Sequence, residues 1–200
     1  MLLHDKLKEY RLILASQSPR RRQLLADAGI EFVLAPRFEC DESFPATLPA
    51  EQVAEYLSCL KADAYPEPLG ERDILLTADT VVIAEGKVLG KPKDRADAIA
   101  IIEQLSGREH QVVTGVSLTN ASTRYSFSAL SRVKFRTLSR EEIEYYVDNY
   151  RPFDKAGAYG IQEWIGYVGI EGIEGSFYNV MGLPIQRVYC ELKEFLGFDE

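Results

Sequence analysis

The sequence is poor in the residues from which zinc sites and disulfide frameworks are built. Its 200 residues include two histidines and three cysteines, and no two cysteines form a C-x-x-C pair. A zinc centre and a disulfide-rich fold both need more such residues at closer spacing. We therefore expect Cys40, Cys59 and Cys190 to be free thiols. A serine–histidine–aspartate triad would need His110 as its base, and we expect His110 instead to order the start of a strand.

Long apolar runs and an excess of positive charge are also absent. No hydrophobic stretch approaches the roughly 20 residues that span a membrane, and residues 1–11 lack the apolar centre of a signal peptide. The formal net charge is −8, whereas proteins that bind duplex nucleic acid present basic surfaces. We therefore expect a cytoplasmic protein that binds neither a membrane nor a nucleic-acid polymer.

What the sequence contains is the composition of a globular enzyme. Hydrophobic residues make up 46% and charged residues 27%, which is too apolar for a disordered chain. This length suits one domain, or two lobes that share a core, and we predict a single domain over residues 1–200. Hairpin signals and helical periodicities alternate along the chain, so we predict an α/β or mixed α+β fold.

Local patterns predict the following elements. We expect strands over 13–15, 32–35, 74–84, 87–89, 111–119 and 125–136, and helices over 19–28, 51–64, 94–105, 139–150 and 184–196. Glu85-Gly86 is a hairpin turn signal, and Ser139 with Glu142 forms a capping box. Residues 154–182 form a glycine-rich stretch without a predicted element.

The segment LILASQSPRRRQLL, residues 12–25, places cations where a helix disfavours them. Ser18 is a good N-cap and Pro19 suits the first helical position, so Arg20–Arg22 fall in the first turn. The helix dipole is positive there, which disfavours each cation by roughly 0.3–1 kcal/mol. A bound phosphate would reverse this balance. The alternative is three solvated arginines, one of them paired with a nearby carboxylate.

Four further residues carry charges that suit phosphate chemistry. Asp79 interrupts the apolar run 74–84, and a buried carboxylate needs a metal, a cation or a proton, unless it caps a loop at the strand end. Asp41 and Glu42 offer oxygens to a hard metal ion, although acidic loops are common on surfaces. Lys91 is either a phosphate ligand or a solvated turn residue.

The stretch 154–162 adds a polar group of another kind. Its glycines allow the backbone to approach a ligand closely, and the Gln162 amide carries both a donor and an acceptor, which suits a nucleobase edge. The alternative is a glycine-bearing loop with an exposed amide. Together, arginines, carboxylates and a lysine supply the parts for metal-assisted cleavage of a phosphoanhydride.

On these residues the sequence resembles the Maf family, the septum-formation-inhibitor-like nucleoside triphosphate pyrophosphatases. The matching motifs run in family order from about residue 11 to 196. They are LASQSPRR at 14–21, ADTVV at 78–82, GKP at 90–92, LSGR at 105–108 with His110, DKAGAYGIQ at 154–162 and NVMGLP at 179–184.

The resemblance implies a fold like that of the inosine triphosphate pyrophosphatases, a central mixed sheet flanked by helices, with two lobes and a cleft. It implies hydrolysis of a nucleoside triphosphate to the monophosphate and pyrophosphate, which keeps unwanted nucleotides from being incorporated. It also implies a divalent cation, Mg²⁺ or Mn²⁺, and a homodimer.

The resemblance also implies roles for single residues. Asp79 matches the proton acceptor, while Arg20, Thr80 and Gln162 match the positions tied to substrate choice in the branch that acts on dTTP and UTP. The branch acting on 7-methyl-GTP has Ser-Asp-Gln-Val in place of ADTV at 78–81, and it lacks the Tyr-Gly-Ile-Gln stretch. We therefore favour the pyrimidine branch.

The resulting hypothesis assigns the metal to Asp79 and Glu42. The loop before Glu42 is one residue longer than in many relatives, which leaves Asp41 as the alternative ligand, with Glu42 preferred. The substrate would be bound by Ser16, Arg20, Arg21, Thr80, Lys91 and Gln162, while Arg22 lies outside the matched positions. Two alternatives stay open. One is a pyrophosphatase for 7-methyl-GTP or a noncanonical purine triphosphate, and the other is a nucleotide-sensing regulator of cell division.

Overall fold

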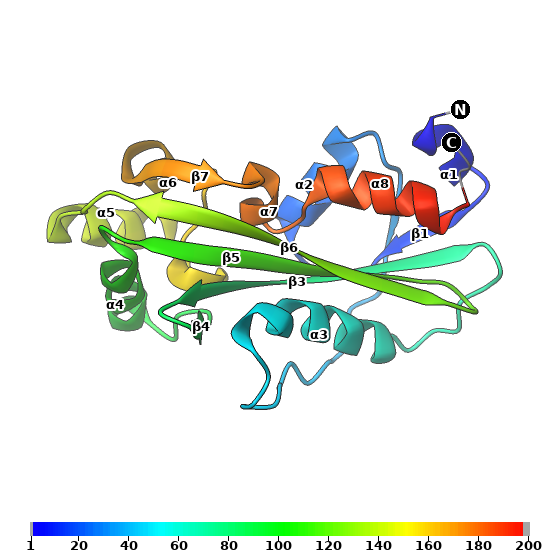
Figure 1. Cartoon of the computed structure of the whole chain (residues 1–200), viewed down its shortest axis with the longest axis horizontal. Coiled ribbons are helices and arrows are strands. Elements are labelled where there is room, and N and C mark those ends of the chain that lie inside the picture. Colours follow the sequence, from blue (N-terminus) through cyan, green and yellow to red (C-terminus); the bar gives the residue numbers. More distant parts are fainter. Residues whose placement is uncertain (1, 198–200) are drawn as a thin grey trace. The chain divides into compact units, whose positions relative to one another are not determined.

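The computed structural model describes residues 2–197 and has the predicted mixed α/β architecture (Figure 1). The sheet has the strand order β2-β1-β3-β5-β6-β7, with β4 beside β3. Strand β1 pairs in parallel with β2 and β3, whereas β3 with β4 and β6 with β7 are antiparallel, so the sheet is mixed. No helix among residues 2–197 is long and apolar enough to cross a membrane.

The strands are β1 (Arg11–Leu14), β2 (Val33–Leu34), β3 (Asp73–Ala84), β4 (Lys87–Leu89), β5 (Glu109–Thr119), β6 (Arg124–Phe135) and β7 (Ile170–Glu174). The helices are α1 (Leu3–Leu7), α2 (Pro19–Asp27), α3 (Ala50–Asp63), α4 (Arg95–Leu105), α5 (Arg140–Tyr150), the short 3₁₀ segment η1 (Ala156–Ala158), α6 (Trp164–Gly169), α7 (Phe177–Met181) and α8 (Ile185–Phe195).

The chain forms two compact units. The first unit extends to Asp79 and adds Thr114–Ala129 and the chain from Gly182 onward. The second unit consists of Thr80–Val113 and Leu130–Met181. Three long strands, β3, β5 and β6, contribute residues to both units.

In the first unit, helix α3 lies unusually close to the sheet. Val53, Ala54 and Leu57 bury one face of this helix, following the predicted helical spacing. On β5, a side chain at Gly115 would overlap the backbone of Ala54 and Glu55. Glycine is therefore required at residue 115 so that the helix backbone can approach the strand.

Local signals in the second unit are formed as predicted. Ser139 and Glu142 make the reciprocal capping box of α5, and the Asp94 side chain accepts a hydrogen bond from Asp97 N–H, which caps α4. Glu85 and Gly86 both have positive φ, as a two-residue hairpin turn requires, and they join β3 to β4. These helices pack on a core that includes Phe135.

The sequence patterns assigned no helix or strand to residues 154–182. Helix α6, strand β7 and helix α7 all lie within this stretch, and α1 near the N-terminus was also not predicted. Inside α6, a side chain at Gly166 would overlap the Ile161 carbonyl group. That glycine permits close packing instead of ending a helix.

Replacing Gly115 by alanine should force α3 away from β5 and lower the free energy of unfolding by about 3 kcal/mol, because the backbone on both sides resists displacement. Gly172 is the matched control, since a methyl group there meets nothing within 4 Å. Urea denaturation of Gly115→Ala and Gly172→Ala measures both effects. Equal stability of the two variants would contradict the close approach of helix and strand.

Candidate active site

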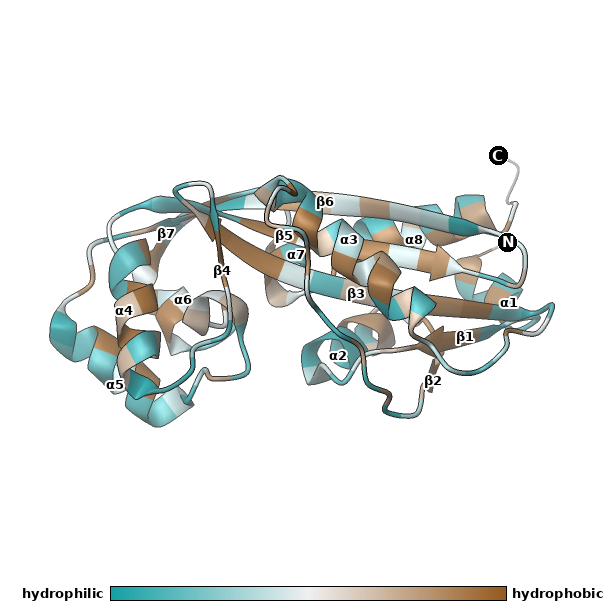
Figure 2. Cartoon of the chain, turned by 90° about the horizontal axis from the view of Figure 1, so that it is seen from below, coloured by the Kyte–Doolittle hydropathy of each residue, from teal (hydrophilic) through white to brown (hydrophobic). Residues whose placement is uncertain are grey.

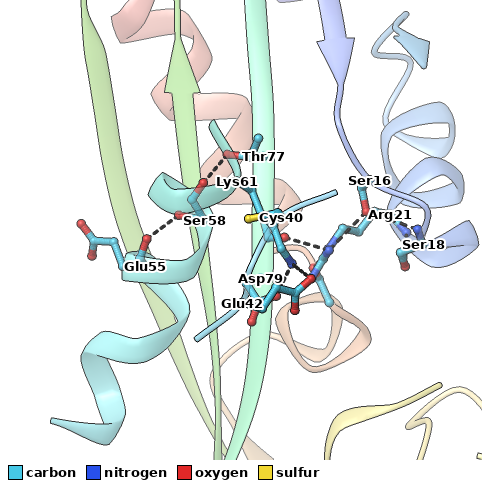
Figure 3. Close-up of polar contacts among 12 residues, drawn as sticks. Ser16, Ser18, Arg21, Cys40, Glu42, Glu55, Ser58, Lys61, Thr77 and Asp79 are labelled. Atoms are coloured by element: carbon cyan, nitrogen blue, oxygen red, sulfur yellow. Dashed lines mark hydrogen bonds and ion pairs between the residues drawn. The ribbon is translucent and has the colours of Figure 1, made fainter. Parts of the chain in front are cut away.

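A cation meets the predicted catalytic carboxylate inside the first unit. The Lys61 Nζ atom donates a hydrogen bond to Asp79 Oδ1 at 2.5 Å (Figure 3). Both side chains are largely buried, with 15% and 13% of their surfaces exposed. Of the three compensations expected for a carboxylate in an apolar strand, the structure therefore provides a cation. The Asp79 Oδ2 atom is not used by this ion pair.

The register of α3 on β3 brings the two charges together. Thr77 Oγ1 donates to the Ser58 carbonyl oxygen at 2.7 Å, and Ser58 Oγ donates to the Glu55 carbonyl oxygen at 2.7 Å (Figure 3). Thr77 and Asp79 share one face of β3 because strands repeat every two residues, and Ser58 and Lys61 share one face of α3 because they are three apart. The hydrogen bond from the Thr77 side chain to the backbone of α3 thus sets the position of the ion pair.

Lys61 was not among the predicted site residues. A signal was nevertheless present, because residue 61 continues the apolar stripe of Val53 and Leu57 at four-residue spacing. A lysine on the buried face of a helix needs a buried anion. The sequence alone does not show which carboxylate lies opposite.

Glu42 approaches the same cation, and Asp41 does not. The Glu42 Oε1 atom lies 3.3 Å from Lys61 Nζ. Both carboxylate oxygens of Asp41 instead accept hydrogen bonds from Ser43, one from its N–H and one from its hydroxyl. The structure therefore brings Glu42 together with Asp79, while Asp41 stabilises a local turn.

The carboxylates of Glu42 and Asp79 suit a metal ion that takes its other ligands from water and a bound phosphate compound. Among residues 2–197, no group of three or more histidine, cysteine, aspartate or glutamate side chains is arranged to hold a metal ion. Glu42 and Asp79 nevertheless converge on one positive charge. Mg²⁺ commonly takes one or two protein carboxylates and completes its shell with water and substrate phosphates. The two residues fit such an ion and do not fit a structural metal with only protein ligands.

Arg21 is enclosed by oxygen acceptors of the protein. Its Nε donates to the Gly182 carbonyl at 2.7 Å, and its NH1 donates to the Ala78 carbonyl at 2.9 Å and to Ser16 Oγ at 3.2 Å (Figure 3). Burial lowers the pKa of Arg21 from its ordinary value, while the charge of Asp79 opposes this shift. Neither sequence interpretation of the arginines anticipated these carbonyl contacts.

The start of α2 is formed as predicted. Ser18 is the N-cap and its side chain accepts from Arg21 N–H, while Pro19 opens the helix. Arg20 and Arg22 are both half-buried in its first turn. Four residues of the predicted site, Ser16, Arg20, Arg21 and Asp79, therefore belong to the first unit together with Glu42.

The remaining predicted site residues belong to the second unit. Thr80 follows Asp79 in β3 and is half-buried, and Lys91 is exposed on the loop after β4. Gln162 directly precedes the N-cap of α6, and its side-chain oxygen Oε1 is buried without a hydrogen-bond partner in residues 2–197. A buried unpaired acceptor is costly, and Gln162 shares this state with His110 Nδ1 and Asn179 Oδ1 among the described residues.

His110 is a structural residue at the start of β5, as the sequence predicted. Its side chain is buried, and Nε2 lies 2.7 Å from the Tyr159 hydroxyl oxygen. Burial lowers the pKa of His110 to about 4. The three cysteines are free, and burial raises the pKa of Cys40, which suits an inert thiol.

Comparisons with known proteins give matches over nearly the whole chain. The family model described as Maf-like protein matches residues 11–195. A dTTP/UTP pyrophosphatase of Bacteroides thetaiotaomicron is 53% identical over 188 residues, which cover 94% of this chain and 97% of that protein. One from Porphyromonas gingivalis is 51% identical, covering 96% and 97%. A solved HAM1 protein from Coxiella burnetii matches with 15% identity and a TM-score of 0.48, covering 92% of this chain and 99% of that one.

Removing either partner of the ion pair should leave a buried charge uncompensated. We expect Lys61→Met to lower the free energy of unfolding by about 3 kcal/mol, whereas Lys87→Met at the exposed first residue of β4 should change it by less than about 0.5 kcal/mol. Adding Asp79→Asn to Lys61→Met should recover part of the loss. Urea denaturation of the double-mutant cycle measures the coupling, and strictly additive losses would contradict a direct ion pair.

The depressed pKa of His110 predicts acid sensitivity. The folded-state pKa of about 4 lies below the ordinary value of 6.5, so protonation favours the unfolded chain. Stability should therefore be lost as the pH falls from about 6.5 towards about 4. The loss should be about 3 kcal/mol greater in wild type than in His110→Gln, which cannot titrate. Parallel stability curves of the two proteins would contradict this assignment.

Proposed function

The chain belongs to the Maf family, and on this premise we propose that it hydrolyses dTTP and UTP to the corresponding nucleoside monophosphate and pyrophosphate. The observation that carries the proposal is the largely buried ion pair of Asp79 and Lys61, which the more exposed Glu42 carboxylate also approaches. It occurs in a chain that is 47–53% identical to proteins named dTTP/UTP pyrophosphatase. One of these, from Christiangramia forsetii, is matched over its full length.

Asp79 is the proton acceptor of the proposed reaction. A water molecule attacks the α-phosphorus, the bond from that phosphorus to the bridging oxygen breaks, and pyrophosphate leaves. The attacking water passes a proton to the Asp79 carboxylate, whose Oδ2 atom lies outside the ion pair with Lys61. Lys61 holds Oδ1 and so fixes the orientation of the acceptor. A fixed acceptor loses little entropy when the water is positioned.

Cationic side chains neutralise the triphosphate. Arg20 in the first turn of α2 adds a guanidinium to the positive end of the helix, and Lys91 adds a point charge. Arg21 contributes charge while its donors hold Ser16 and two carbonyl groups in place. These groups favour departure of the anionic pyrophosphate.

Glu42 and Asp79 would hold Mg²⁺ or Mn²⁺. When bound, such an ion neutralises phosphate oxygens and increases the electrophilicity of the phosphorus. The convergence of both carboxylates on Lys61 supports this assignment, because their oxygens already surround one cation.

Gln162 and Thr80 would select the base. Uracil and thymine present an N–H donor at N3 and a carbonyl acceptor at O4, which complement the two polar groups of one glutamine amide. The buried, unpartnered Oε1 atom of Gln162 supports this role because it would accept the N3 proton. Thr80 would limit the depth of the base pocket.

Three further proposals concern context. Free cysteines support a cytoplasmic site of action, because thiols persist in reducing compartments. The family match over 11–195 includes residues of both units, which supports one functional domain. We also propose that the protein forms a homodimer.

Asp79→Asn should lower pyrophosphate release from UTP and dTTP by about 10²- to 10⁴-fold, because the proton acceptor is lost while the shape is kept. Circular dichroism checks that the variant is folded. A variant that retains most of its activity would contradict the role of Asp79.

A substrate panel with Mn²⁺ separates the alternatives. The proposal predicts the highest kcat/KM for UTP and dTTP, with the monophosphate and pyrophosphate as products. A higher kcat/KM for 7-methyl-GTP or a noncanonical purine triphosphate would indicate the other pyrophosphatase function. Tight nucleotide binding with negligible turnover would indicate a nucleotide-sensing regulator.

A further inference from the structure

A buried polar cluster in the second unit surrounds the turn that carries Gln162. Lys155 is 8% exposed, and its Nζ atom lies 3.2 Å from Glu163 Oε1 and 2.9 Å from Asp154 Oδ1. The fully buried Tyr146 of α5 donates its hydroxyl proton to Glu163 Oε2. Figure 2 shows α5 and α6 within one group of helices in this unit.

The cluster fixes the backbone on both sides of Gln162. Gly160 N–H donates to the Tyr146 hydroxyl oxygen at 2.9 Å. Glu163 N–H donates to the Gly160 carbonyl at 3.0 Å, and the Glu163 side chain is held by Tyr146 and Lys155. Residues 160–163 are therefore tied to α5 through one hydroxyl group, which both accepts and donates.

The earlier part of the same loop is held by different contacts. A side chain at Gly157 would overlap Val82, and Gly157 N–H donates to the Gly90 carbonyl at 3.2 Å. The Tyr159 hydroxyl pairs with His110. The end of the loop, where Gln162 lies, instead depends on the Tyr146 hydroxyl and the Glu163 carboxylate.

Burying a lysine, a carboxylate and a tyrosine hydroxyl has no general advantage for stability, since apolar residues of similar volume often serve as well. Burial together with the Glu163 charge raises the pKa of Tyr146, so its hydroxyl remains a donor at neutral pH. A satisfied polar cluster does, however, specify one backbone arrangement. One fixed backbone arrangement is useful beside Gln162, because the orientation of its amide would select the ligand.

We propose that Tyr146, Glu163 and Lys155 are positioning residues for base recognition, and this inference rests on the proposed function. They hold Gln162 so that its amide reads the N3–H and O4 groups of uracil or thymine. Cytosine presents the reverse pattern, an acceptor at N3 and an amino donor, and a glutamine amide turned by half a rotation would match it equally well. Discrimination between these bases therefore requires a fixed glutamine.

The test compares Tyr146→Phe with Tyr150→Phe on UTP and CTP. The first variant removes the bridging hydroxyl and keeps the ring, while the second removes the hydroxyl of the stacked neighbour, whose ring centroid lies 5.2 Å away. In Tyr146→Phe we expect KM for UTP to rise about tenfold with kcat within about threefold of wild type. The preference for UTP over CTP in kcat/KM should fall about tenfold. Tyr150→Phe should resemble wild type in both.

Combining Tyr146→Phe with Gln162→Ala tells a positioning role of the tyrosine from a purely structural one. In a Gln162→Ala background, Tyr146→Phe should cause no further change in KM or preference, because the group that it positions is gone. If Tyr146→Phe lowers only thermal stability, or acts equally with and without Gln162, the inference is overturned. If Tyr146→Phe fails to fold, Glu163→Gln is measured in the same way. This variant keeps an acceptor for the Tyr146 hydroxyl and loses the ion pair with Lys155.

Measurements on the wild-type protein tell a failure of the proposed function from a failure of the positioning role. Without pyrophosphate release from UTP by wild type, the proposed function itself is wrong. With release in wild type and an unchanged UTP preference in Tyr146→Phe, the function stands and the positioning role is wrong.

Discussion

The ion pair between Asp79 and Lys61 is the interaction on which the first unit depends. A carboxylate within an apolar strand needs its charge compensated, and in this strand the compensation is a cation. Lys61 reaches it because α3 lies against β5 at Gly115 and is held to β3 through the Thr77 hydroxyl. Glu42 then approaches the same ammonium group. The packing of α3 therefore also provides the charge compensation for Asp79. As a result, two carboxylates converge on the Lys61 ammonium group.

In the second unit, the polar group of the predicted site that lies buried is the neutral Gln162 amide. Gln162 contributes a neutral amide, which can distinguish bases by hydrogen-bond pattern, whereas the carboxylates and cations of the first unit can act on phosphates whatever base is attached. The Tyr146 hydroxyl and the Glu163 carboxylate restrict the backbone beside that amide. In the proposed function, reaction chemistry rests on charged side chains, Lys91 of the second unit among them, and base selection rests on the Gln162 amide. Substitutions in the two sets should therefore affect different kinetic constants.

Much of the fold was predictable because its signals are local. The Ser18 cap, the Glu85-Gly86 turn and the Ser139 capping box depend on residues within three positions of one another. The partner of Asp79 was not predictable, because Lys61 meets it through tertiary packing. Arg21 was predicted in the correct helical turn, but its carbonyl acceptors come from distant segments. The elements within 154–182 were not predictable for the same reason, since the close contact at Gly166 appears only in the folded chain.

The central claim is that the Asp79 carboxylate directs water to the α-phosphorus of a pyrimidine nucleoside triphosphate. Hydrolysis of UTP in ¹⁸O-labelled water, followed by mass spectrometry of both products, tests this most directly. The account predicts one labelled oxygen in UMP and none in pyrophosphate. Label in pyrophosphate would mean attack at the β-phosphorus, and release of labelled orthophosphate would mean attack at the γ-phosphorus. Either result would contradict the account.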